Sequence, residues 1–329
     1  MKEKILKLLK RKGEDGILQS NITNELNLSK STVSTSLSQL EKENKIYREK
    51  VAGKSKRVWL LDRVPHSLDN LIRIGIIRAA EYPHVVLAAK QMNEKSQVRV
   101  FDDAREATRA LDKGQIDIAF TPLRTQIYHS LVNQKFKIYA GCARKGCGII
   151  ARSVPSENTA YASSSLSTME MNLKRFLEER ELNPYRMNIT YFKTPGEIFR
   201  SYLRGEVEAV SIWEPYLSLL RAQTENPLVF PPTRPLRTSP CCTLGVNNRF
   251  IEKNEVLFKK FLEEYIDASE KFKKRKFLEK GADMLAERTN LDKNLLLASF
   301  ENYEFTYRLR EEKILNYVEN FDLKIDHKT

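Results

Sequence analysis

The sequence predicts an α/β protein in which a small α+β domain precedes a larger α/β module of two lobes. A repeated pattern indicates the module: residues 106–120 and 197–211 each read as an amphipathic helix, a Gly and an acidic-flanked apolar strand. Gly suits the left-handed position that ends a helix, and an apolar run suits a strand buried in a parallel sheet. Charge indicates the front domain, because residues 1–65 carry 15 Lys/Arg against 8 Asp/Glu.

Length and composition set the outer bounds. A chain of 329 residues with 41% hydrophobic residues can build two or three cored domains. The basic excess in residues 1–65 favours a nucleic-acid partner for that part, and a merely soluble basic segment is the alternative. Four Cys in a chain this long do not form a disulfide framework. Since residues 1–12 show no export signal and no apolar run spans a bilayer, we expect a cytoplasmic location and no membrane partner.

The front domain reads as three helices followed by a β-hairpin. Apolar residues recur at helical spacing, and Ser29 suits the N-cap of the third helix. The other face of that helix is rich in small hydroxyl and amide side chains, which are poor helix formers but suit close approach to phosphates and base edges. The expected elements are helices over residues 2–12, 19–26 and 29–44 and strands over residues 46–51 and 57–61.

This arrangement resembles the winged helix-turn-helix of archaeal and bacterial transcription regulators. The resemblance covers residues 1–62 and rests on Asn21–Leu26 and Leu28–Ser34, which read NITNEL and LSKSTVS. It implies operator DNA as the partner and a homodimer, because one recognition helix reads too few bases for useful specificity. A winged helix used for protein contacts is the alternative. The expected DNA contacts are Lys30, Ser31, Thr32, Ser34, Thr35, Lys50, Lys54, Lys56 and Arg57.

Beyond a short Pro-containing linker, residues 63–70, strands and helices alternate through residues 71–329. Gly245-Val246-Asn247 is expected to return the chain to the first lobe. Lobe 1 then holds about residues 71–152 and 240–329, and lobe 2 about residues 153–239. Besides the repeated units, the expected strands cover residues 71–77, 98–101, 136–140, 148–151, 159–162 and 187–192, and the expected helices cover 82–92, 166–180, 254–274, 275–288, 292–300 and 310–320.

The order of these elements resembles the periplasmic binding proteins of the nitrate, sulfonate, taurine and thiamine-pyrimidine group. The resemblance covers about residues 71–320, and its most specific piece is Trp213-Glu214-Pro215-Tyr216 after a buried strand. It implies a type 2 periplasmic-binding-protein-like fold, in which two lobes enclose a ligand. Members of that group are normally exported, whereas this chain carries a DNA-binding front domain. The cleft is therefore expected to sense a small-molecule effector.

Ligands of open α/β sheets meet the carboxyl ends of strands and the helix N-termini beside them. Four places in the module fit this rule: residues 79–82, 121–122, 163–168 and 213–214. The Ser/Thr-rich residues 163–168 offer hydroxyls and free N–H groups to an anion. Trp213 and Glu214 offer an aromatic face and a carboxylate to a flat, amine-bearing ring. Helix capping and core packing are the alternatives. The expected ligand contacts are Glu81, Tyr82, Thr121, Ser163, Ser164, Ser165, Thr168, Trp213 and Glu214.

The cysteines, Cys142, Cys147, Cys241 and Cys242, match no compact zinc pattern, and no catalytic constellation is evident. We therefore expect no metal, no cofactor and no enzymatic activity. The predicted function is a one-component transcription regulator that senses an anionic or heteroaromatic metabolite. The alternatives are a solute-binding protein, a ligand-independent DNA-architectural protein, or a cytoplasmic enzyme like the thiamine-pyrimidine synthases. Those synthases resemble the chain around Cys241-Cys242, so the enzyme reading predicts iron bound there.

Overall fold

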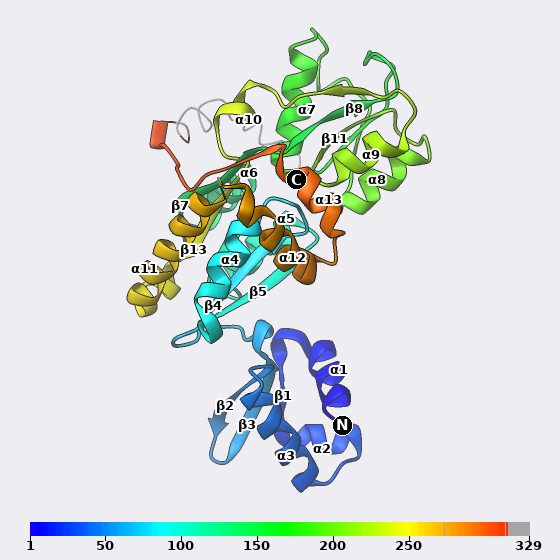
Figure 1. Ribbon diagram of the computed structural model, residues 1–329. Coiled ribbons are helices and arrows are strands. Elements are labelled where there is room, and N and C mark those ends of the chain that lie inside the picture. Colours follow the sequence, from blue (N-terminus) through cyan, green and yellow to red (C-terminus); the bar gives the residue numbers. More distant parts are fainter. Residues whose placement is uncertain (273, 313, 315–329) are drawn as a thin grey trace.

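The computed structural model describes residues 1–272, 274–312 and 314. A small domain, here called the head, lies at one end of a larger module with two lobes (Figure 1). The expected fold class is confirmed: the described residues form a three-stranded sheet in the head, a six-stranded sheet in lobe 1 and a five-stranded sheet in lobe 2. None of the helices described combines the length and apolar character needed to cross a membrane.

The head folds around one apolar core, to which Ile5, Ile22 and Val33 contribute from its three helices. Ser29 accepts a hydrogen bond from the backbone N–H of Thr32 at 3.1 Å, so it caps the third helix as expected. The strand order is β1-β3-β2, and all pairs are antiparallel. The elements are α1 (Lys2–Lys12), β1 (Ile17–Leu18), α2 (Gln19–Leu26), α3 (Lys30–Lys42), β2 (Ile46–Ala52) and β3 (Ser55–Leu60).

Lobe 1 is a mixed sheet of order β14-β7-β13-β6-β4-β5. Strands β4, β5 and β6 are parallel, and every residue of β4 is buried, which explains its uninterrupted apolar run. Helices α11 and α12 pack on α4. The strands are β4 (Ile72–Ile77), β5 (Ser96–Phe101), β6 (Ile118–Pro122), β7 (Phe136–Lys145), β13 (Cys242–Asn247) and β14 (Tyr303–Phe305), and the helices are α4 (Pro83–Gln91), α5 (Ala104–Asp112), α6 (Leu123–Asn133), α11 (Asn248–Lys271), α12 (Leu278–Thr289) and α13 (Lys293–Phe300).

Lobe 2 has the sheet order β10-β9-β11-β8-β12. Its first helix, α7, is capped by Ser167, whose hydroxyl accepts the backbone N–H groups of Met169 and Glu170. The next, α8, begins with a capping box between Thr194 and Glu197. The elements are β8 (Cys147–Ala151), β9 (Tyr161–Ser163), α7 (Thr168–Glu178), β10 (Ile189–Tyr191), α8 (Pro195–Leu203), β11 (Ala209–Trp213), α9 (Tyr216–Gln223), β12 (Leu228–Phe230) and α10 (Arg234–Thr238).

The two repeated stretches fold alike, as α5–β6 in lobe 1 and α8–β11 in lobe 2. The Gly that ends each helix has a left-handed φ, +71° in lobe 1 and +72° in lobe 2. The acidic residue before each strand has the same task in both lobes. Asp117 accepts the backbone N–H of Arg73 at 2.9 Å, and Glu208 accepts that of Ala160 at 3.1 Å. Each carboxylate therefore ties its strand to the start of the neighbouring parallel strand.

The first crossover between the lobes falls at Gly146, earlier than the expected boundary at residue 152. Strand β8 was expected in lobe 1, but it pairs with β11 and β12 of lobe 2. Strand β7 runs on to Lys145 and the chain turns directly into β8, a close approach that needs glycine: a Cβ on Gly146 would meet the Tyr303 ring at 1.8 Å. The return of the chain through β13 follows the expectation. The helix expected over residues 310–320 lies largely outside the described residues.

The head is fixed to lobe 1 at the amino-terminal ends of its parallel strands. The side chain of Arg73, at the start of β4, donates to the carbonyl oxygen of Val64 in the linker and to Asp117. Ser67 of the linker donates to Asp117 at 2.9 Å, and Gln115 of lobe 1 donates to Glu14 of the head. The linker is therefore bound along its length to lobe 1, and the head and lobe 1 form one unit.

Candidate functional site

A cavity lies between the lobes at the opposite, carboxyl ends of β4, β5 and β6. The space between the lining atoms is about 550 Å³, a figure that includes open solvent at the mouth. Both lobes contribute, and the wall combines aromatic, hydroxyl, thiol and charged side chains. The lining residues are Ile77, Ala79, Glu81, Tyr82, Asp102, Asp103, Ala104, Arg105, Pro122, Ser164, Ser165, Ser167, Thr168, Met169, Phe192, Lys193, Trp213, Cys241 and Cys242.

Most of the expected ligand contacts come together in this wall, although they lie far apart in the sequence. The three that do not are Thr121, Ser163 and Glu214. Thr121 is fully buried and its hydroxyl accepts a hydrogen bond from Thr108 at 3.0 Å. Ser163 is fully buried at the end of β9. The expected contacts that line the cavity are Glu81, Tyr82, Ser164, Ser165, Thr168 and Trp213.

Glu214 turns away from the cavity and closes a helix end. Its carboxylate accepts the backbone N–H of Ser218 at 3.1 Å, the hydroxyl of Ser218 at 2.9 Å and the side-chain amide of Asn302 at 2.8 Å. In this structure the Glu214 carboxylate makes the contacts of the capping alternative and does not line the cavity. The carboxyl group beside Trp213 in the cavity wall belongs to Glu81.

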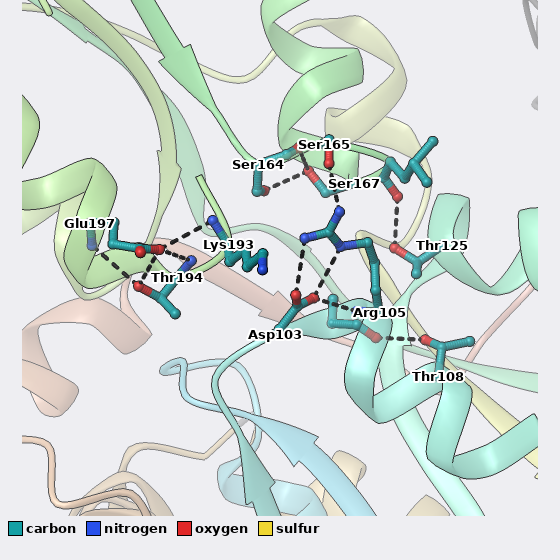
Figure 2. A network of polar contacts seen from close by, with 12 residues as sticks. Asp103, Arg105, Thr108, Thr125, Ser164, Ser165, Ser167, Lys193, Thr194 and Glu197 are labelled. Carbon is teal, nitrogen blue, oxygen red and sulfur yellow. Dashed lines mark hydrogen bonds and ion pairs between the residues drawn. The ribbon is translucent and has the colours of Figure 1, made fainter. Parts of the chain in front are cut away.

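Four charged residues of the wall, Asp102, Asp103, Arg105 and Lys193, are absent from the expected set. The Arg105 guanidinium pairs with the Asp103 carboxylate at 3.0 Å and donates across the cleft to the Ser165 hydroxyl at 2.9 Å. Figure 2 shows this network with the Lys193 side chain extending toward it. Asp103 and Arg105 follow the carboxyl end of β5, so the rule that ligands meet strand ends would have found them.

The loop before α7 joins the two lobes at the cavity. In addition to the bond from Arg105 to Ser165, the Thr125 hydroxyl of α6 donates to the Leu166 carbonyl at 2.9 Å. The Thr168 hydroxyl donates to the Cys241 carbonyl at 3.2 Å. Three hydrogen bonds thus connect residues 165–168 of lobe 2 with lobe 1, and this side of the cleft is closed.

A cluster of potential metal ligands lies in the cavity wall. The carboxylate of Glu81 and the thiols of Cys241 and Cys242 have ligand atoms within 4.8 Å of one another, and all three residues are buried. Burial raises the pKa of Glu81 to about 8 and the pKa of Cys242 well above its usual range. Thiolates and a carboxylate suit Zn²⁺ or Fe²⁺. Sequence spacing does not reveal the cluster, because the fold brings Glu81 to the cysteines.

Four of the nine expected DNA contacts lie in one groove of the head. Lys30, Ser34, Lys54 and Lys56 line one groove between α3 and the β2–β3 wing, together with Gln19, Ser20 and Thr23 of α2. Sequence reasoning missed these α2 residues, which reach the groove because α2 packs across α3. The exposed expected residues are Lys30, Ser31, Ser34, Thr35, Lys50, Lys54 and Lys56.

Three expected DNA contacts, Arg57, Thr32 and Ser31, form hydrogen bonds within the protein. Arg57 is half-buried and donates to the Asp15 carbonyl at 3.2 Å, which ties the wing to the body of the head. The Thr32 hydroxyl lies 2.8 Å from that of Ser29 at the start of α3. Arg48 lies in the groove as well, but it is paired with Glu41. The free positive charge of this face therefore comes from its lysines.

These features define a DNA-binding head joined to a two-lobed ligand-binding module. Residues 69–286 match the profile of the NMT1-like family, and residues 1–47 match that of the winged helix-turn-helix DNA-binding family. The chain belongs to the NMT1-like family and carries a winged helix-turn-helix at its front. No curated protein matches it in sequence.

Solved structures share the fold of the module. The chain is similar to the ligand-binding component of an ABC-type import system from Staphylococcus aureus, solved with zinc bound (TM-score 0.65, 14% identity, 76% of this chain and 92% of that one). It is also similar to the periplasmic aliphatic sulphonate-binding protein SsuA from Escherichia coli (TM-score 0.61, 18% identity, 77% and 88%). The alkanesulfonate-binding SsuA of Xanthomonas axonopodis, bound to MOPS, is a third (TM-score 0.64, 14% identity, 76% and 90%). The resemblance to periplasmic binding proteins is thereby confirmed for the fold.

Proposed function

We propose that this protein is a one-component transcription regulator: the head binds operator DNA as a homodimer, and the module closes on a small-molecule effector. The observation that carries the proposal is the fixed joint between a winged helix with an exposed basic groove and a lobe of a ligand-binding module. Binding to DNA implies a cytoplasmic location. The effector acts through its differential affinity for the open and closed module.

Selection of DNA tests the first half of the proposal. Full-length protein is incubated with random double-stranded DNA, and the enriched sequences are measured for affinity over a range of salt concentrations. We expect a two-fold symmetric site, as two heads would read it, and a steep loss of affinity with salt. Recovery of no preferred sequence, or of a complex that salt does not weaken, would overturn the DNA-binding role.

Thermal-shift screening tests the second half. Sulfonates, nitrate, amino acids and thiamine precursors are the panel, because a ligand that binds the folded state raises the apparent stability by mass action. A hit should then change operator affinity. An effector that saturates the module and leaves operator affinity unchanged would contradict the sensor role. The solute-binding alternative predicts that outcome, and an architectural DNA-binding protein predicts no hit at all.

The cluster of Glu81, Cys241 and Cys242 favours the second candidate function, an enzyme of the thiamine-pyrimidine type. The structure supports it only through the chemistry of these donors, which could hold iron. Metal analysis of the purified protein, with the double variant Cys241→Ser/Cys242→Ser as control, separates the two functions. Stoichiometric iron that is lost in the variant supports the enzyme, and metal-free protein with DNA affinity supports the regulator.

A further inference from the structure

Two polar atoms in the cavity wall are buried without a hydrogen-bond partner among the described residues. They are Oε1 of Glu81 and Nε1 of Trp213. Glu81 is 3% exposed. A buried unpaired donor or acceptor costs about 1–3 kcal/mol, and most such groups in folded proteins are paired. At a cavity wall, a bound molecule can supply both partners.

The two atoms belong to adjoining parts of the wall. The backbone N–H of Ala80 donates to the carbonyl oxygen of Glu214 at 3.2 Å. Ala80 precedes Glu81 and Glu214 follows Trp213, so this single hydrogen bond holds the two segments together across the cleft. Lobe 1 supplies the carboxyl group and lobe 2 supplies the indole N–H. A ligand that satisfies both therefore also bridges the lobes.

We propose that the effector binds here through a planar edge that presents a hydrogen-bond donor beside an acceptor, as in a primary carboxamide or an amino group next to a ring nitrogen. The acceptor receives the indole N–H of Trp213. The donor meets the carboxylate of Glu81. Phe192 and Met169 line the same cavity and can pack against the body of a ring.

Lys193 adds a second element of recognition. It lines the cavity and forms no ion pair within the described residues, whereas Arg105 is paired with Asp103 and Asp102 with Arg78. An anionic substituent on the ring would meet this lysine. The inference rests on the proposed function only in assigning the cavity to the effector, since it names the chemistry of that effector.

The test reads the indole N–H groups by ¹H–¹⁵N NMR of the full chain. The sequence has two Trp residues, so two indole signals are expected, and Trp59 is an internal control because its Nε1 already donates to the Glu14 carbonyl at 2.9 Å. The probes are benzamide and 2-aminopyridine, which carry the donor–acceptor edge. Methyl benzoate has only the acceptor, and toluene has neither.

Benzamide or 2-aminopyridine should shift the Trp213 signal saturably, leave Trp59 in place, and bind at least ~10-fold more tightly than methyl benzoate, the worth of one added hydrogen bond to a charged group. The probe that binds better distinguishes the carboxamide from the amino-ring source. Glu81→Leu should abolish the preference over methyl benzoate. Trp213→Phe should remove one signal and weaken the probe in ligand-detected NMR. Thermal unfolding confirms that both variants fold.

Equal affinities for benzamide, 2-aminopyridine and methyl benzoate, or no saturable shift of Trp213 with any probe, would overturn the inference. The outcome is independent of the DNA experiments, which use no probe. A Trp213 shift in a protein that selects no operator would keep the ligand chemistry and remove the regulator. Operator selection without a Trp213 shift would do the reverse.

Discussion

The Arg73 guanidinium donates two hydrogen bonds of 2.9 Å, from Nε and from Nη2, to the Asp117 carboxylate. The Arg73 side chain is 2% exposed and that of Asp117 is 0% exposed. The same arginine donates to the Val64 carbonyl of the linker and to the Gly114 carbonyl. A bidentate pair is directional, so it fixes the linker to one place on lobe 1. The same ion pair therefore stabilises the repeated unit of lobe 1 and attaches the linker of the head to that lobe.

Asp117→Asn is expected to destabilise lobe 1 and release the linker. Removing one partner of a buried pair leaves an uncompensated charge, at a cost of ~3–5 kcal/mol. Urea unfolding measures the loss, and limited proteolysis should show new cleavage within residues 63–70. The matched control is Glu255→Gln, which removes an exposed partner of Lys259 and should cost at most ~1 kcal/mol. Similar losses of unfolding free energy in both variants would show that the Arg73–Asp117 pair does not hold the linker on lobe 1.

Lys54→Ala and Lys56→Ala are each expected to weaken DNA binding through the loss of phosphate contacts. Both side chains are exposed in the groove between α3 and the wing. The slope of log affinity against log salt should become shallower by ~0.9 for each contact removed. Affinity is measured from 50 to ~200 mM salt. Lys259→Ala, a loss of the same charge on α11 of lobe 1, should leave the slope unchanged.

Ser165→Ala is expected to loosen the closed side of the cleft. It removes the acceptor of the Arg105 hydrogen bond and leaves the Arg105–Asp103 pair in place. A hydrogen bond to a charged group contributes ~1.5–3 kcal/mol, so amide exchange of residues 164–168 should accelerate ~10-fold or more. Ser31→Ala on the head is the control of the same chemistry. Unchanged exchange in this loop would show that other contacts hold the cleft.

The titration of Glu81 predicts how stability depends on pH. Burial raises its pKa from 4.5 to about 8, so the folded state holds this proton more tightly than the unfolded chain. Its contribution is fully present below pH 4.5 and is lost as the pH rises through 8. Thermal unfolding between pH 5 and 8 should therefore show a decline in the wild type that is reduced in Glu81→Leu, by roughly 2–4 °C for each kcal/mol. If the melting temperature of the wild type and that of Glu81→Leu depend on pH in the same way, a group other than Glu81 causes the decline.

Sequence alone predicts most of the architecture, because its signals are local. Ser29 caps α3 as expected, and the two left-handed glycines close the repeated helices. The alternation of helix and buried strand then leaves few ways to pair the strands. The acidic residue of each repeat was visible, but its partner on the neighbouring strand was not.

The site is predicted less well, because it depends on side-chain direction and on the crossover. Trp213 faces the cavity while its neighbour Glu214 does not, and no spacing rule separates them. The boundary at Gly146 was missed because β7 and β8 are consecutive strands that enter different sheets. Arg105 follows the carboxyl end of a strand that the sequence does indicate, so the rule that ligands bind at such strand ends could have predicted it.

The head lies at the amino-terminal ends of the three parallel strands of lobe 1 (Figure 1). The cavity lies at their carboxyl ends. Lobe 1 thus carries the head at one end of its strands and forms one wall of the cavity at the other end. A change in the angle between the lobes would therefore move lobe 2 relative to lobe 1 and leave the head in place on lobe 1. If the protein is the regulator proposed above, a signal from the cavity can reach the DNA only through contacts that lobe 2 makes with a second copy of the chain.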